Sequence, residues 1–149
     1  MKTIFDKAAY SELLMRIKQL QKNTSPLWGK MNSAQMLAHC NSTTEVALGD
    51  IMIPQSLMGK LIGGLFKKSF LSEKPFSKNG PTAAEFIMAE AKDFEKENER
   101  ALLLLKRFHE GGEPGATKHP HAFFGKLTSK QWGETQWKHF DHHLRQFGV

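Results

Sequence analysis

Histidine is the residue type in this chain whose spacing most directly suggests chemistry. His139 and His143 lie four residues apart in the C-terminal stretch 132–149, whose apolar residues recur at the spacing of a helix. At about 100° per residue, the two positions differ by only about 40° around the helix axis and lie about 6 Å apart along it. Two imidazoles placed in this way can reach one divalent metal ion. We therefore interpret this pair as the start of a metal site.

The helix face that carries this pair is expected to be buried. It also carries Trp132, Gln136 and Phe147, so the helix should turn it toward the core. His142 could replace one member of the pair, but it lies about 60° from His139 and further from the centre of the apolar stripe. We therefore favour the pair His139 and His143. We expect Gln136 to lie close to this pair, where it would contact either a ligand histidine or the substrate.

A third imidazole comes from an earlier helix. Asn32 and Gln35 form a capping box that predicts a helix start, and Gly49 predicts its end. One face of this helix is formed by Met36, His39, Cys40, Thr43, Val46 and Ala47. His39 therefore faces inward, and three imidazoles around an open position are a pattern of catalytic metal sites. Cys40 points about 100° away from its neighbour, so we expect a small buried side chain rather than a fourth ligand.

Other predicted helices would hold these histidines in place. A first helix should span 6–21, a long one 82–110 with a capping box at Thr82 and Glu85, and a last one should begin at Thr128. Four helices without a strand pattern predict an all-α bundle, and the chain length suits a single domain over 1–149.

Two carboxylates fall within the apolar stripe of the long predicted helix. Glu90 and Glu97 either orient a ligand histidine or lie near a solvated end of the bundle. His119 and His121, in the loop 111–127, are further candidates for the surroundings of the site. Gln146, after the histidine pair, could contact a substrate or help to cap the helix end.

The segment 50–80 is the least regular part of the chain. Residues 57–66 suggest a short helix weakened by glycines. We favour a long crossover packed on the bundle over a lid or a basic stretch lying on a membrane surface.

Composition limits the class of protein. The chain has 149 residues, 40% of them hydrophobic and 24% charged, with a net charge of +6, which is typical of a globular domain. Its lysines are scattered, so nucleic-acid binding is not expected. The single cysteine excludes an intrachain disulfide, and neither a signal peptide nor an apolar run long enough to span a membrane is visible. These features predict a cytoplasmic protein.

Three segments resemble a known family. MNSAQMLAHC (31–40), FFGKLT (123–128) and WGETQWKHFDHHLRQFGV (132–149) are similar to the DUF1569 branch of the DinB-like superfamily. The resemblance implies a four-helix bundle in an up-up-down-down arrangement, with a long crossover between its second and third helices. It also implies a three-histidine site for a divalent metal, which by position is His39, His139 and His143. Either His119 or His121 matches the histidine of a His-Pro pair that this branch usually carries.

The resemblance also suggests a reaction. DinB-like relatives include metal-dependent S-transferases that use low-molecular-weight thiols, so we expect a small-molecule thiol and an electrophile as substrates. Three neutral imidazoles leave the metal its double charge, which makes a bound thiol or water more acidic. The alternatives are a metal-dependent hydrolase and a non-enzymatic metal-binding or stress-associated bundle. Zinc or nickel is the expected metal, and relatives suggest a homodimer.

Overall fold

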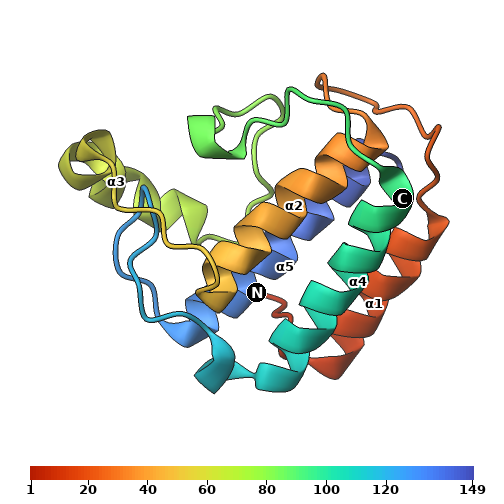
Figure 1. Ribbon diagram of the computed structural model, residues 1–149. Helices are drawn as coiled ribbons and strands as arrows, with labels where there is room; N and C mark the ends of the chain where they lie inside the picture. Colours follow the sequence, from red (N-terminus) through yellow and green to blue (C-terminus); the bar gives the residue numbers. More distant parts are fainter.

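The computed structural model covers residues 1–149, and all of its regular elements are helical (Figure 1). This confirms the predicted all-α class. The α-helices are α1 (Lys7–Gln19), α2 (Ser33–Leu48), α3 (Leu57–Phe70), α4 (Phe94–Gly111) and α5 (Ser129–Gln146), and the short 3₁₀ turns are η1 (Ala84–Phe86) and η2 (Glu113–Gly115).

The two helices that carry the histidines begin where their capping residues predict. The Asn32 side chain accepts a hydrogen bond from the Gln35 backbone N–H, and the Gln35 side chain accepts one from the Asn32 N–H. Thr128 and Gln131 form the same reciprocal pair at the start of α5. These hydrogen bonds satisfy backbone donors that have no partner inside the helix, so both helix starts are set locally.

Helices α1, α2, α4 and α5 form the bundle, and contacts between them give their directions (Figure 1). Trp137 donates to the Ala9 carbonyl and Arg16 pairs with Asp141, so α1 and α5 are parallel. Helices α2 and α4 are also parallel, because Asn41 contacts Glu97 and, further along in both cases, Asp50 just after α2 contacts Arg107.

Helices α2 and α5 are antiparallel. The later residue of α2, Thr44, contacts the earlier residue of α5, Gln136, whereas His39 contacts His139.

The expected up-up-down-down arrangement is therefore wrong, because the four bundle helices run up-down-down-up. The connection 20–32 links the top of α1 to the top of α2 and reverses the chain direction (Figure 1). The segment 49–93 returns along the whole bundle, so α4 starts at the same end as α2. The expected long crossover between the second and third bundle helices is present.

The third bundle helix starts later than predicted. It begins at Phe94 and not at Thr82, and its N-cap is Asp93, whose side chain accepts a hydrogen bond from the Lys96 N–H. Residues 82–93 are mostly extended, apart from η1. The physical reason is tertiary: the Phe86 carbonyl accepts a side-chain hydrogen bond from α2, which replaces the backbone pairing of a continuous helix.

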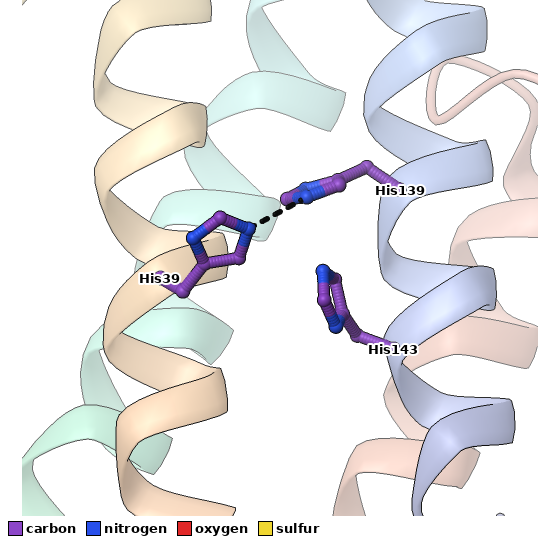
Figure 2. A group of neighbouring side chains, drawn as sticks. All are labelled: His39, His139 and His143. Atoms are coloured by element: carbon purple, nitrogen blue, oxygen red, sulfur yellow. Dashed lines mark hydrogen bonds between the residues drawn. The ribbon is translucent and has the colours of Figure 1, made fainter. Parts of the chain in front are cut away.

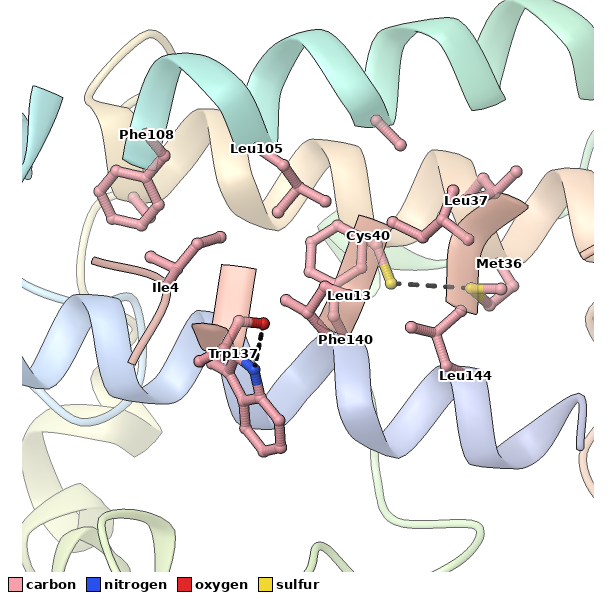
Figure 3. Close-up of a cluster of buried hydrophobic side chains, with 14 of the residues drawn as sticks. Ile4, Leu13, Met36, Leu37, Cys40, Leu105, Phe108, Trp137, Phe140 and Leu144 are labelled. Carbon is pink, nitrogen blue, oxygen red and sulfur yellow. Dashed lines mark hydrogen bonds between the residues drawn. The ribbon is translucent and has the colours of Figure 1, made fainter. Parts of the chain in front are cut away.

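The core lies between the four bundle helices (Figure 3). Its largest fully buried apolar side chains include Trp132, Phe108, Phe140, Leu105 and Met36. Cys40 lies among them, with its Sγ 3.8 Å from the Sδ of Met36. The prediction of a small buried side chain is therefore confirmed.

Helix α3 stands apart from the bundle (Figure 1). The sequence predicted a short helix over 57–66, and the structure extends it to Phe70. None of the five α-helices combines the length and apolar character needed to cross a bilayer.

Candidate metal centre

Three imidazoles meet between α2 and α5 (Figure 2). His39 comes from α2, and His139 and His143 come from successive turns of α5. Their ligand nitrogens all lie within 4.8 Å of one another, with His39 and His143 buried and His139 partly exposed. The four-residue spacing therefore places both α5 rings beside one ring of α2, as the sequence predicted.

Gln136 helps to hold α2 against α5 one turn from the imidazoles. Its Nε2 donates to the Thr43 carbonyl at 3.3 Å, and its Oε1 accepts from the Thr44 hydroxyl at 3.3 Å. Its side chain hydrogen-bonds to these two threonines and not to a histidine. It ties α5 to the turn of α2 that contains Thr43, and Thr43 itself contacts the site.

Each of the three rings has an outer hydrogen bond through its Nδ1 atom. His39 donates to the Phe86 carbonyl at 2.9 Å, and His143 donates to the Oε1 atom of Gln146 at 2.8 Å. Thr43 donates its hydroxyl proton to the Cys40 carbonyl, so its oxygen accepts from the Nδ1–H of His139 at 3.1 Å. The outer partners therefore favour the same tautomer in all three rings, with the proton on Nδ1 and a lone pair on Nε2.

The orientation of Gln146 is itself fixed. Its Nε2 donates to the Trp28 carbonyl at 2.7 Å, so its other terminal atom, Oε1, is the one that faces His143. The loop before α2 thus fixes the orientation of the Gln146 amide, and this amide in turn fixes the orientation of the His143 imidazole. Such outer partners orient metal-binding histidines and fix their tautomers in many proteins.

The donor set fits a divalent metal ion. Zinc–imidazole bonds of about 2.0–2.1 Å in a tetrahedral site place two ligand nitrogens about 3.3 Å apart. The His39 and His139 Nε2 atoms are 2.9 Å apart, and one ligand nitrogen from each of the three rings lies within 4.8 Å of the others. These three residues could therefore hold a metal ion after small side-chain movements.

Burial keeps the three imidazoles in the neutral form that binds metals. It is the main reason why the pKa of His143 falls to about 3, and the neighbouring His39 lowers it further. Burial also lowers the pKa of His39, against the opposing effect of its hydrogen bond to Phe86. The pKa of His139 falls well below its ordinary value through burial and through His143 and His39. A desolvated imidazole resists protonation because its charged form loses the stabilisation of water.

The two glutamates do not contact the imidazoles. Glu97 accepts from the Asn41 side chain at 2.8 Å and lies 3.5 Å from Arg100. Glu90 is exposed and lies outside any helix, and only its carbonyl is used, by Gln35. The sequence placed Glu90 on the long helix, and this is wrong because α4 starts only at Phe94.

His119 and His121 differ in their surroundings. His119 is exposed. The Nδ1 atom of His121 accepts a hydrogen bond from the Phe123 N–H at 3.0 Å, and its ring stacks on Trp132 of α5. Burial, assisted by Lys67, lowers the pKa of His121 to about 4. It is therefore His121 that lies against the histidine-bearing helix, where it organises a turn.

His142 does not belong to the group of three imidazoles, although its ring centroid lies 5.0 Å from that of His143. Its ring lies 5.9 Å from those of Trp28 and Phe76, and together they line a small pocket of about 130 Å³. The remaining lining residues are Pro75, Lys78, Lys138, Asp141 and Arg145. Arg145 pairs with Asp141 at 3.0 Å. This geometry agrees with the preference for His139 and His143 over His142.

Sequence reasoning missed two members of the site. Thr43 lies on the inward stripe of α2, four residues after His39, so its position was a usable signal. The sequence carried no signal for the Phe86 carbonyl. It placed Phe86 inside a continuous helix, where the carbonyl would accept a hydrogen bond from a backbone N–H.

Comparison with known proteins gives one match. A family model described as "Protein of unknown function (DUF1569)" matches residues 5–148. No curated protein and no solved structure was found to match the chain.

Proposed function

Since the chain belongs to the DUF1569 family, we propose that this protein binds one divalent metal ion through His39, His139 and His143. One observation carries the proposal: all three rings have an acceptor at Nδ1, and all three Nε2 atoms converge. A histidine buried only for packing needs one partner, whereas this arrangement leaves three lone pairs facing one point.

The proposal includes membership of the DinB-like superfamily. It is supported by the four-helix bundle, by the long crossover 49–93, and by the positions of the imidazoles on the second and last bundle helices. A homodimer, which the same resemblance implies, belongs to this proposal as well.

Zinc and nickel are the proposed metals. Imidazole nitrogen suits both ions, and a set of three histidines leaves positions free for a substrate. The outer partners of the rings are a carbonyl, a hydroxyl and an amide, all of them neutral. Because no carboxylate partner offsets its charge, a metal in this site would keep its full acidifying effect.

We further propose that the protein catalyses the attack of the sulfur of a small-molecule thiol on an electrophile, so that the thiol becomes conjugated to the electrophile. A divalent metal bound here would lower the pKa of a coordinated thiol or water. The protein would hold the three imidazoles in the binding tautomer, and the partly exposed edge at His139 would give access. The segment around Phe86 shields the opposite edge, at His39.

A hydrolase is the less favoured alternative. Attack by water usually uses a protein base to take up its proton. Glu97 is held by Asn41 and Arg100, and Glu90 is exposed, so neither carboxylate is positioned to act as this base beside the imidazoles. A thiol has a pKa of about 8.5 before any activation and does not need such a base.

Elemental analysis of untagged protein, with an activity assay, tests the proposal. We expect about one zinc or nickel ion per chain, and conjugation of a thiol from a panel to a fluorogenic electrophile. His143→Ala should lose both the metal and turnover, whereas His142→Ala, a change in the adjacent histidine, should keep the metal.

Two outcomes would redirect the proposal. A metal-free protein that is fully active would contradict it. Metal at the expected ratio without turnover across the panel would favour the non-enzymatic metal-binding bundle.

A further inference from the structure

One face of α3 is apolar and turned away from the rest of the protein. Leu57, Leu61 and Leu65 are 75%, 72% and 78% exposed. At about 100° per residue these leucines fall within about 80° of one another. Met58, also more than half exposed, extends the same surface. We refer to these four residues as the α3 outer face.

Glycines fix the orientation of this helix. A Cβ atom on Gly63 would lie 2.1 Å from the Phe123 carbonyl oxygen, and one on Gly59 would lie 2.6 Å from the same atom. Only a glycine edge can approach the loop backbone this closely. The opposite edge is the α3 outer face, so the leucines must point to solvent.

Hydrogen bonds hold the helix in this position. The Ser56 N–H donates to the Ala122 carbonyl at 2.8 Å, and the Gln55 side chain donates to the Phe123 carbonyl at 3.3 Å. Lys67 donates to the Lys126 carbonyl at the other end of the helix. A helix fixed at both ends cannot roll its apolar side chains onto the bundle, so the α3 outer face needs a partner outside this chain.

The charged side chains of α3 itself are all positive. Lys60 and Lys68 are exposed beside and within it. The sequence has no carboxylate between Asp50 and Glu73. A second copy of the chain that packed face to face here would bring lysines together without carboxylates to pair with them. A negatively charged apolar partner suits this surface better.

We propose that the α3 outer face binds the surface of an anionic lipid bilayer. An amphipathic helix with leucines on one side and lysines beside them lies in the plane of such a surface, with its apolar face in the acyl boundary. Each lysine near the headgroups strengthens binding to anionic lipid by about fivefold. The helix lies on the bilayer and does not cross it, in agreement with the lack of a spanning helix.

Sedimentation with vesicles of phosphatidylcholine, with and without phosphatidylglycerol, tests this proposal on the full chain. We expect binding to the anionic vesicles, weaker binding to neutral ones, and a decrease with added salt. Leu61→Ser with Leu65→Ser should reduce binding at least about tenfold, because two exposed leucines no longer enter the bilayer.

Matched variants separate this surface from general effects. Met15→Ser with Leu103→Ser removes two exposed apolar side chains from α1 and α4 and should leave binding unchanged. Lys60→Gln with Lys68→Gln should weaken binding more than Lys18→Gln with Lys106→Gln, which causes the same change in net charge.

Two results would overturn the proposal. One is the absence of vesicle binding by the unaltered chain, or equal binding by all the variants. The other is a dimer in analytical ultracentrifugation that dissociates when Leu61 and Leu65 are changed, because the face would then be an interface between copies.

Discussion

The Nε2 atom of His39 lies 2.9 Å from the Nε2 atom of His139, although the outer hydrogen bonds of both rings favour a lone pair at each of these atoms. Two lone pairs at this distance repel each other. Without a metal, one of two things must happen. Either one ring changes tautomer and gives up its outer hydrogen bond, or one ring becomes protonated and carries a positive charge in a buried position. A bound cation would satisfy both lone pairs, so the outer partners favour the arrangement that a metal ion would need.

Replacing Thr43 tests this relationship. Thr43→Val keeps the shape of the side chain but removes the oxygen that accepts from His139. Outer partners of this kind contribute about ten- to a hundredfold to metal affinity, so we expect a loss in that range in a competition titration with a chromophoric chelator. Thr43→Ser should retain the affinity. Equal metal affinity in the valine and serine variants would mean that Thr43 contributes only packing and that its hydroxyl does not support His139.

Acid should destabilise the metal-free protein. Burial lowers the pKa of His143 to about 3 and that of His121 to about 4, whereas unfolded histidine has a pKa of about 6.5. Between these values the unfolded chain binds protons that the folded chain does not, so the free energy of unfolding falls as pH falls. The expected slope is about 1 kcal/mol per pH unit for each such histidine.

Urea unfolding of chelator-treated protein between pH 7 and pH 5 measures this slope. His143→Gln should reduce the slope, since it removes one of the buried groups. His119→Gln changes an exposed histidine and serves as the control, with an unchanged slope. A free energy of unfolding that stays constant over this range would show that the buried histidines do not control acid stability.

The histidine-bearing helices could be predicted because their information is local. Capping residues at Asn32 and Thr128 set the helix starts, and the apolar spacing set the faces that turn inward. A four-residue spacing on a buried face was then enough to pair His139 with His143. The third imidazole, that of His39, followed from the same kind of pattern on α2.

The rest depended on contacts between distant parts of the chain. The region 82–93 has helix-forming residues, yet it contains only the 3₁₀ turn η1, and the Phe86 carbonyl accepts from His39 and not from the backbone of a continuous helix. The cap at Asp93, followed by Glu95 in the first turn, was a local signal that the earlier Thr82 and Glu85 pair obscured. The relative directions of α1 and α2 depend on how the connections cross the bundle, which residue spacing within a helix does not contain.

Cys40 should be inert although it follows His39 of the proposed metal site. It is fully buried beside Met36, and burial raises the pKa of its thiol. The reactive thiolate is therefore scarce, and iodoacetamide should label the native protein only after denaturation. Cys40→Ala should keep the metal and lose about 1 kcal/mol of stability through the small cavity. Loss of the metal in this variant would instead make Cys40 part of the site.

Neighbouring glycines of α3 should respond in opposite ways to the same substitution. Gly63→Ala would place a Cβ atom 2.1 Å from the Phe123 carbonyl oxygen, whereas Gly64→Ala would meet nothing within 4 Å. The first change should force α3 off its loop, and the second should stabilise the helix by about 0.5–1 kcal/mol. Hydrogen exchange of the amides in 57–70 should accordingly become faster in Gly63→Ala and slower in Gly64→Ala. Equal protection in both variants would contradict the close packing that keeps the leucines of α3 exposed.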